Sequence, residues 1–283
     1  MNQNRVSGIA VKKLWSEIKD DLGSFSIQKD KTTFQLIEKK KISAFVINRE
    51  KIIICGLRFV TSFIKERFSS LYIQSQFDDG NIIKKNTKIL KISGDARIIL
   101  SIERTILNFL QHLSSISTYT NEFVKKIQKN TKLLDTRKTT TGLRVLEKYA
   151  TKIGGAINHR MGLYDKILIK DNHIKLIGGI SKTLKKVKKL KIKDFIIECD
   201  SPRQVKKCLS FGASYIILDN MSIKQIKECL IIKKEFSHKI QYEVSGCVNI
   251  DNVKLYANLG VDFISTSKIT NSAKSVDIGL DII

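Results

Sequence analysis

The sequence predicts an α/β protein in which a barrel-like parallel sheet follows a separate α+β domain. From Leu133 onward, short apolar runs end in polar or charged residues: "KLLDTRK", "KILIKDN", "FIIECDS", "YIILDN", "YEVSG" and "DFISTS". Strands buried on both faces read as continuous Ile, Leu and Val runs, and helices between them imply parallel crossovers. Helix-like segments lie at 202–210, 221–234 and 249–260. Six clear strands, with "GAINHR" as a candidate seventh, favour a barrel-like sheet over a sandwich.

The N-terminal part of the chain has a different pattern. "SAFVINREKIIICG" predicts a hairpin, and "LYIQSQFDDGNIIKKNTKILKISGDARIIL" alternates like antiparallel strands around "DDG" and "SGD" turns. Between these stretches, "LRFVTSFIKERF" predicts a helix. A long amphipathic helix over residues 102–128 then joins this α+β domain to the barrel.

The chain is strongly basic, with 51 Lys and Arg against 27 Asp and Glu and a net charge of +24. Such a balance is typical of proteins that bind nucleic acid, anionic membranes or anionic substrates. Here the composition is rich in Ile, Lys and Asn, which spreads lysine over surfaces whatever the partner. The run "KTLKKVKKLKIK" carries apolar residues at nearly helical spacing, so it predicts a solvated helix face. We therefore expect no nucleic-acid partner.

No apolar run approaches the roughly 20 residues that a membrane helix needs, so we expect no membrane partner. The five cysteines form no close pair and no metal-binding spacing. With no secretory signal at the N-terminus, they predict reduced thiols in a cytoplasmic protein. Cys199 and Cys247 fall in strand-like runs, where buried thiols are expected.

Polar residues gather at one end of the predicted strands. The carboxyl ends of parallel strands meet at the same edge of a barrel, and that edge carries the chemistry. Six strands that all end in this way predict a site rather than satisfied core groups. The polar residues are 135–138, 170–172, Glu198, Asp219, Ser245, Gly246, Thr266 and Ser267.

The charges in these segments predict a pocket for a ligand with two anionic parts. Clustered cations repel one another unless an anion compensates them, and the acidic pair Glu198 and Asp219 suits Mg²⁺ or ribose hydroxyls. The turns "VSGC" and "STS" offer backbone N–H groups to a phosphate. The ligands indicated are a carboxylated small molecule and a phosphorylated sugar. The cations are Arg137, Lys138, His159, Arg160 and Lys170.

Other polar residues have simpler interpretations. Arg144 and Lys148 in "GLRVLEKY" predict a solvated helix face. His173 is equally consistent with a ligand contact and with a capping residue after "IKDN". Gly154 and Gly155, just upstream of His159, favour close backbone packing at a ligand.

The motifs resemble one known family. "ERTILNFLQHLSSIST", "LDTRKTTTGLRVLEKYA", "GGAINHRMGLYDKILIKDNHI", "IIECDS", "ILDNMS", "EVSGCV" and "VDFIS" occur in order, at matching spacing, over nearly the whole chain from Asp20. The chain resembles the quinolinate phosphoribosyltransferases, also called nicotinate-nucleotide pyrophosphorylases (carboxylating).

The resemblance implies an N-terminal α/β sandwich domain and an open, TIM-like parallel α/β barrel of about seven strands. We therefore expect the sandwich over residues 1–110, the barrel over 111–267, and a segment 268–283 that returns to the sandwich. The resemblance also implies a homodimer. The activity that the resemblance implies is that of a decarboxylating pentosyltransferase of NAD biosynthesis. Its substrates would be quinolinate and phosphoribosyl pyrophosphate, and its product nicotinate mononucleotide.

The likeness carries roles onto matching residues. Arg137, His159, Arg160 and Lys170 would grip the quinolinate carboxylates beside Thr136. Lys138, Glu198 and Asp219 would hold phosphoribosyl pyrophosphate and its Mg²⁺, with Glu198 and Asp219 as direct or indirect ligands. Ser245, Gly246 and Cys247, with Thr266, Ser267 and Lys268, would bind the 5′-phosphate. Arg104 would reach into the partner's pocket. The catalytic group would be Lys138, Lys170, Glu198 and Asp219.

The sequence departs from the family pattern in an early turn, where the family's "G-D-x-T" is here "SFSI" (residues 24–27), and at four further positions. The family usually has proline at Thr141, glycine at Cys247 and Ser267, and histidine at Asn271. Two alternatives stay open, and the altered phosphate turns and the high charge favour the second of them. One is a related phosphoribosyltransferase that acts on nicotinate without decarboxylation. The other is a degenerate paralogue that binds phosphate or polyanions without turnover.

Overall fold

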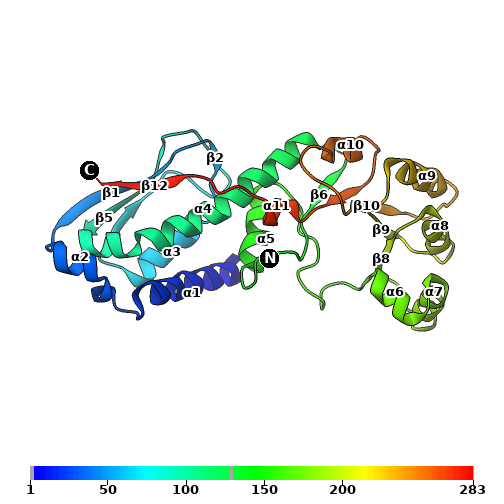
Figure 1. The fold of residues 1–283 in the computed structure, drawn as a ribbon, viewed down its shortest axis with the longest axis horizontal. Coiled ribbons are helices and arrows are strands. Elements are labelled where there is room, and N and C mark those ends of the chain that lie inside the picture. Colours follow the sequence, from blue (N-terminus) through cyan, green and yellow to red (C-terminus); the bar gives the residue numbers. More distant parts are fainter. Residues whose placement is uncertain (1–2, 128–129, 283) are drawn as a thin grey trace. The chain divides into compact units, whose positions relative to one another are not determined.

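The computed structural model describes residues 3–127 and 130–282, which form two compact units (Figure 1). Unit 1 comprises the residues up to Thr120, Thr141–Gly154 and the residues from Ala273. Unit 2 comprises Asn121–Thr140 and Gly155–Ser272. The predicted boundary at residue 110 falls inside a continuous helix, α4 (Ala96–Lys126), whose first part belongs to unit 1. Each unit is described by itself below.

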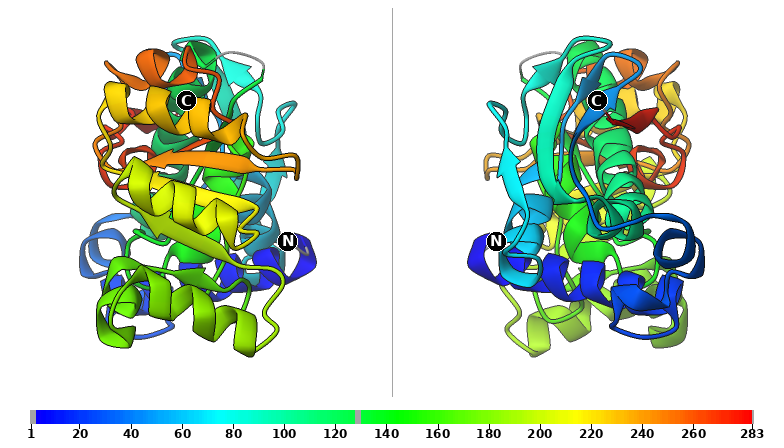
Figure 2. Two further views of the ribbon diagram at one scale, coloured as in Figure 1. Left: turned by 90° about the vertical axis from the view of Figure 1, so that its right-hand side faces the viewer. Right: turned by 90° about the vertical axis from the view of Figure 1, so that its left-hand side faces the viewer.

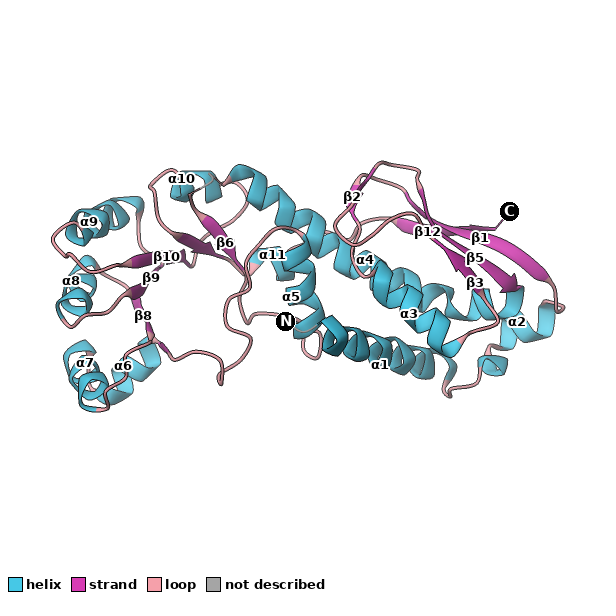
Figure 3. Ribbon diagram, turned by 180° about the vertical axis from the view of Figure 1, so that it is seen from behind, coloured by secondary structure: helices cyan, strands magenta, loops and turns pink. Residues whose placement is uncertain are grey.

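Unit 1 is built on a four-stranded antiparallel sheet in the order β12-β1-β5-β3. Helices α1, α3 and α4 pack on one face of this sheet (Figure 3). Buried aliphatic and aromatic residues from the three helices and the strands form one continuous core. The elements other than α4 are α1 (Gln3–Leu22), η1 (Ile27–Lys29), α2 (Lys31–Leu36), β1 (Lys41–Asn48), β2 (Ile52–Ile53), α3 (Leu57–Arg67), β3 (Tyr72–Gln74), β4 (Ile82–Ile83), β5 (Lys88–Asp95), α5 (Arg144–Ile153) and β12 (Ile278–Ile282).

The predicted helix between the first strands is confirmed as α3, whereas the predicted hairpin is wrong. Strand β1 pairs with β5 and with β12, near the end of the chain, and β2 pairs with β4. The segment that follows β1 does not pair with β1, because side-chain hydroxyls of α4 accept hydrogen bonds from the backbone of this segment. The backbone N–H of Ile53 donates to Oγ1 of Thr118 at 2.9 Å, and that of Cys55 donates to Oγ of Ser114 at 3.0 Å.

Helix α5 is buried on more than one side, so the predicted solvated face is wrong. Lys148 is fully buried and Arg144 is half-buried. Leu146 and other α5 residues pack in a core cluster with residues of α1, α3 and α4. On another side, the buried carboxylate of Glu147 lies 3.0 Å from Nε2 of His112 in α4.

Gly154, which ends α5, packs against protein rather than at a ligand. A Cβ at this position would lie 2.5 Å from the carbonyl oxygen of Ser117 and 2.6 Å from the side chain of Thr120, both in α4. Real Cβ contacts are never that short, so the glycine is required by the approach of helix α5 to helix α4. The close packing that the sequence predicted is present, but its cause is a helix contact.

Unit 2 is built on a six-stranded parallel sheet in the order β6-β11-β10-β9-β8-β7. Helices α7, α8 and α9 lie on one side of β8, β9 and β10 (Figures 1 and 2). The elements are β6 (Lys132–Leu134), β7 (Leu168–Ile169), α6 (Asp171–Ile177), α7 (Ile180–Lys189), β8 (Ile196–Cys199), α8 (Pro202–Ser210), β9 (Tyr215–Asp219), α9 (Ile223–Lys233), β10 (Gln241–Ser245), α10 (Val253–Ala257), β11 (Phe263–Ser265) and α11 (Lys268–Asn271).

The described sheet has six strands, and the segment "GAINHR" contributes only an isolated parallel bridge between Ile157 and Leu134. The strand pairing ends at this bridge because the buried carboxylate of Asp135 accepts hydrogen bonds from the next two residues. Its Oδ1 accepts from the backbone N–H of His159 at 2.8 Å, and its Oδ2 accepts from Nδ2 of Asn158 at 2.6 Å. The segment therefore turns toward the carboxyl end of the sheet instead of continuing as a seventh strand.

Local signals explain why α8 and α9 form where the sequence predicted them, whereas only Val253–Ala257 (α10) of the predicted segment 249–260 is helical. Pro202 occupies the first turn of α8, where a missing N–H costs nothing. Ser222 caps α9 through its side chain and forms a capping box with Gln225. The lysine run lies on α7, with Leu184 and Val187 buried and the lysines exposed, which confirms a solvated helix face.

A search of the described helices finds none with the length and apolar character needed to cross a bilayer.

Candidate active site

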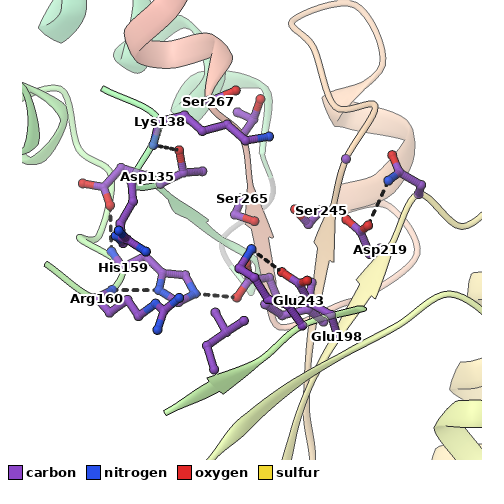
Figure 4. Close-up of a pocket in the computed structure, with 18 of the residues that line it drawn as sticks. Asp135, Lys138, His159, Arg160, Glu198, Asp219, Glu243, Ser245, Ser265 and Ser267 are labelled. Atoms are coloured by element: carbon purple, nitrogen blue, oxygen red, sulfur yellow. Dashed lines mark hydrogen bonds and ion pairs between the residues drawn. The ribbon is translucent and has the colours of Figure 1, made fainter. Parts of the chain in front are cut away.

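A cavity of about 510 Å³ opens at the carboxyl ends of the unit 2 strands (Figure 4). Register explains why the side chains converge there. Ser245 pairs with Asp219, and Glu243 pairs with Ile217 one step earlier on the same face. Because side chains alternate along a strand, residues two apart point to the same side of the sheet. The predicted site residues that line the cavity are Thr136, Arg137, Lys138, His159, Arg160, Lys170, Glu198, Asp219, Ser245, Gly246, Cys247, Thr266 and Ser267.

Two predicted residues are not among those that line the cavity. Arg104 is exposed on α4 in unit 1. Lys268 is the first residue of α11, directly after Ser267, and its side chain is exposed. Its backbone N–H donates to Oγ1 of Thr266 at 3.2 Å.

The cationic side of the cavity comes from the segments after β6 and around residue 160. Arg160 is nearly buried, and its Nη1 donates to the carbonyl oxygen of Lys166 at 3.0 Å. Burial lowers the pKa of Arg160, and the nearby charge of Arg137 lowers it further. Cations that destabilise one another in this way favour an anion in the space between them.

The acidic side holds two carboxylates on neighbouring strands. Burial raises the pKa of Glu198, and the hydrogen bond from Lys170 opposes that rise, with Nζ 3.0 Å from Oε1. The charge of Asp219 raises the Glu198 pKa further, so the two carboxylates act on each other electrostatically. Asp219 accepts a hydrogen bond from Nδ2 of Asn220 at 2.9 Å. Within the parts of the chain that the structure describes, no group of three or more His, Cys, Asp or Glu is arranged to hold a metal ion.

The turn after β10 requires glycine at position 246. Gly246 has φ +106°, and a Cβ there would collide with the side-chain amide of Asn220. Asn220 is held in place because its backbone N–H donates to the carbonyl oxygen of Ser245 at 3.0 Å. The next residue, Cys247, has an exposed thiol that donates to Oδ1 of Asn220 at 3.5 Å. The expectation of a buried Cys247 is wrong because β10 ends at Ser245, before the cysteine.

His173 is a capping residue. The backbone N–H of Lys170, at the start of α6, donates to Nδ1 of His173 at 2.9 Å. His173 is not among the residues that line the cavity. The two interpretations that the sequence left open are thereby separated.

Sequence reasoning missed several lining residues, of which Glu243 is the most informative. Glu243 is almost completely buried on β10 and lies 3.2 Å from Nε2 of His159 (Figure 4). Its signal was present in "YEVSG", because a charge two residues before Ser245 must point to the same face. Asn220 also lines the cavity and was not predicted, whereas Asp171 and Ser265 lie in segments that the sequence placed at the site.

Fold and cavity together define an α/β enzyme whose site, at the carboxyl end of a parallel sheet, suits a ligand with several negative charges. The comparison with known families gives the same class. The sequence model "Quinolinate phosphoribosyl transferase, N-terminal domain" matches residues 30–114, and the model for the C-terminal domain matches residues 116–281.

Individual relatives cover nearly the whole chain. A probable nicotinate-nucleotide pyrophosphorylase (carboxylating) of Methanocaldococcus jannaschii is 39% identical, over 97% of each chain. The solved nicotinate-nucleotide pyrophosphorylase of Ehrlichia chaffeensis is 39% identical with a TM-score of 0.89, covering 96% of this chain and 98% of its own. That of Francisella tularensis is 37% identical with a TM-score of 0.88, covering 98% and 97%. The chain is an enzyme of the quinolinate phosphoribosyltransferase family.

Proposed function

We propose that the chain transfers the phosphoribosyl group of phosphoribosyl pyrophosphate to quinolinate, with release of pyrophosphate and CO₂. The product is nicotinate mononucleotide, a precursor of NAD. The observation that carries this proposal is a single cavity with cations on one side and the pair Glu198 and Asp219 on the other. Such a cavity suits a dicarboxylate beside a phosphorylated sugar.

The cationic side is the proposed site for quinolinate. Arg guanidinium groups match carboxylates with two parallel hydrogen bonds, and Lys adds a mobile point charge. Arg137, Arg160 and Lys170 line the cavity, with Thr136 and His159 beside them. Burial lowers the pKa of Arg160 most and the charge of Arg137 lowers it further, and a bound carboxylate would relieve this second effect, which supports the assignment.

The other side is the proposed site for phosphoribosyl pyrophosphate. The turn at Ser245, Gly246 and Cys247 and the turn from Thr266 to Lys268 would present backbone N–H groups to its 5′-phosphate. Lys138 and the two carboxylates would hold the ribose and pyrophosphate.

The donor set fits Mg²⁺ in a particular way. Glu198 and Asp219 are hard oxygen donors, and Mg²⁺ is commonly bound by one or two carboxylates together with substrate phosphates and water. When bound, Mg²⁺ would neutralise the leaving pyrophosphate. The two carboxylates would hold it directly or through water.

The chemistry needs charge neutralisation and alignment more than a protein nucleophile. The ring nitrogen of quinolinate attacks the anomeric carbon as pyrophosphate leaves. The resulting pyridinium stabilises the electron pair left at ring carbon 2 when that carboxylate departs as CO₂, and a proton then replaces it. Arg137, Arg160 and Lys170 would hold the carboxylates in place, so that both alignment of the substrates and charge neutralisation would contribute to the acceleration.

We also propose a homodimer, in which the exposed Arg104 of one copy completes the cavity of the other. An Arg on an outer helix face would supply a further cation to the quinolinate site. We place the enzyme in the cytoplasm, where its five cysteines, including Cys199 and Cys208 with sulfurs 3.6 Å apart, would stay reduced.

The first test is the release of labelled CO₂ from carboxyl-labelled quinolinate, with phosphoribosyl pyrophosphate and Mg²⁺, beside a nicotinate control. Release that needs both substrates is the expected result. Conversion of nicotinate instead would assign the chain to the non-decarboxylating reaction. Saturable quinolinate binding without release would identify a degenerate paralogue, in which the side chains of Cys247 and Ser267 spoil the phosphate turns.

A further inference from the structure

The imidazole of His159 is bonded through both of its nitrogens. The backbone N–H of Arg160 donates to Nδ1 at 2.7 Å, and Nε2 lies 3.2 Å from Oε2 of Glu243 (Figure 4). A ring nitrogen that accepts a hydrogen bond carries no proton, so this geometry favours the tautomer with its proton on Nε2, directed at Glu243.

The carboxylate of Glu243 on β10 is held by a residue of the neighbouring strand β9. Its Oε2 also accepts a hydrogen bond from the hydroxyl of Tyr215 at 2.7 Å. The Tyr215 ring stacks on Phe263 with centroids 5.6 Å apart, which fixes the direction of the hydroxyl. Burial, and then the charge of Glu243, raise the pKa of Tyr215, so the phenol remains a donor at neutral pH. One buried carboxylate oxygen thus receives two fixed donors.

The segment that carries His159 has two separate anchors. Asp135 accepts the backbone N–H of His159 at 2.8 Å, and Glu243 holds its ring. Through the ring, the second anchor reaches the backbone of Arg160, whose guanidinium donates to the carbonyl of Lys166. A displaced imidazole would therefore also release the backbone of a cation that lines the cavity.

We propose that Glu243 and Tyr215 are positioning residues of the quinolinate site, which act by fixing His159 as an uncharged, Nε2-protonated imidazole. The inference rests on the function proposed above. The positive charge opposite the substrate carboxylates then comes from Arg137, Arg160 and Lys170. His159 lines the cavity as an uncharged side chain of fixed orientation. A purely structural Glu–Tyr pair would instead affect both substrates equally.

The tautomer is measured directly, without any need for activity. The chain has only four histidines, so ¹⁵N-histidine labelling of the whole protein gives a small set of long-range ¹H–¹⁵N correlations. The His159→Asn variant assigns the signal of His159. We expect the Nε2–H pattern in the unmodified protein and in Glu243→Gln, which keeps an acceptor, and a mixture of tautomers in Glu243→Ala. An imidazolium or an Nδ1–H pattern in the unmodified protein would overturn the proposal.

Steady-state kinetics test the positioning role. Loss of a buried hydrogen bond to a charged group predicts a rise of about ten-fold in the KM for quinolinate in Glu243→Ala. The KM for phosphoribosyl pyrophosphate should stay within about two-fold, because the second anchor reaches only the quinolinate side. Glu243→Gln should recover most of the loss, and Tyr215→Phe should show a smaller rise of the same kind.

The matched control is Tyr242→Phe. Tyr242 precedes Glu243 on β10, points to the opposite face, and donates its hydroxyl to the carbonyl oxygen of Cys229 at 3.2 Å. This variant loses the same group as Tyr215→Phe and should show no split between the two KM values. Equal rises in both KM values for Glu243→Ala would contradict the proposal. A wild-type protein that releases no CO₂ would instead refute the proposed function, and the tautomer measurement would still stand.

Discussion

Nζ of Lys170 lies 3.0 Å from Oε1 of Glu198, and both side chains line the cavity. This contact joins the two proposed half-sites, because Lys170 belongs to the quinolinate side and Glu198 to the phosphoribosyl pyrophosphate side. The ammonium is the more exposed partner, at 45% against 16% for the carboxylate. The main effect of the pair is therefore to neutralise the charge of a largely buried carboxylate, since ion pairs that are open to water contribute little stability by themselves.

Loss of this ion pair should lower the free energy of unfolding by an amount that depends on pH. Burial raises the Glu198 pKa above its unfolded value, and Lys170→Met removes the group that opposes the rise. Near pH 4, Glu198 is mostly protonated in the folded and in the unfolded protein. The variant therefore loses the least stability relative to the wild type at this pH. This loss should grow as pH rises and reach roughly 1–2 kcal/mol by pH 8, because an ionised carboxylate is then left without its partner.

Urea denaturation at a series of pH values measures that deficit. Adding Glu198→Gln to Lys170→Met should remove the pH dependence. Lys185→Met, on the exposed face of α7, is the matched control and should change stability by less than about 0.5 kcal/mol at every pH. A deficit for Lys170→Met that is the same at pH 4 and pH 8 would contradict this account.

Glu198→Gln should separate the two substrates. The substitution keeps the size of the side chain and removes the charge that would hold Mg²⁺ with the pyrophosphate. We expect the affinity for Mg–phosphoribosyl pyrophosphate to fall by about ten-fold or more, and that for quinolinate to change much less. Titration calorimetry with each substrate checks this, and a larger loss for quinolinate would overturn the assigned role.

Arg104 provides a test of the proposed dimer. Arg104→Ala and Arg137→Ala should each abolish activity while leaving a dimer by size-exclusion chromatography. Random mixing of the two inactive variants gives hybrids in which one site lacks both arginines and the other has both. Because half of the dimers would be hybrids, about a quarter of the wild-type activity should return. No recovery, with subunit exchange shown by mass spectrometry, would count against a shared site.

Cys247 should be the cysteine that reacts first. It is exposed, whereas Cys55, Cys199, Cys208 and Cys229 are buried, and burial raises the pKa of Cys55 and Cys229. Ellman's reagent should therefore titrate about one thiol rapidly in the native protein. Phosphoribosyl pyrophosphate with Mg²⁺ should slow this reaction, because the thiol lies in the proposed phosphate turn.

Variants at position 247 complete that experiment. Cys247→Ser should abolish the rapid phase, and Cys247→Gly, which removes the side chain from the turn, should lower the KM for phosphoribosyl pyrophosphate. Rapid reaction of a second thiol, or a rate that phosphoribosyl pyrophosphate leaves unchanged, would show that Cys247 is not at the phosphate site.

Much of unit 2 could be predicted because its signals are local. A buried parallel strand needs a run of apolar residues, and Pro202 and Ser222 mark helix starts through their own backbone and side-chain chemistry. The rule that parallel strands carry their sites at the carboxyl end then brought Glu198 and Asp219 together without any coordinates.

Predictions failed where a residue's partner lies far away in the chain. The pairing of β1 with β12 joins segments more than 200 residues apart, so the nearby β2 was a misleading partner. The same holds for Gly154, whose neighbours are on α4, and for Lys148, whose helix is covered on more than one side. Periodicity reports that one face of a helix is buried, but not how many other elements cover it.

The sequence by itself determined the class of elements, their order, and the charges that meet at the carboxyl end of the sheet. These follow from the period of apolar residues and from the rule that parallel strands point the same way. Only the tertiary structure decided that His173 caps a helix, and that Glu243 and Tyr215 lie behind His159. Such contacts depend on distances between side chains of different strands, which register and packing set and a linear pattern does not contain.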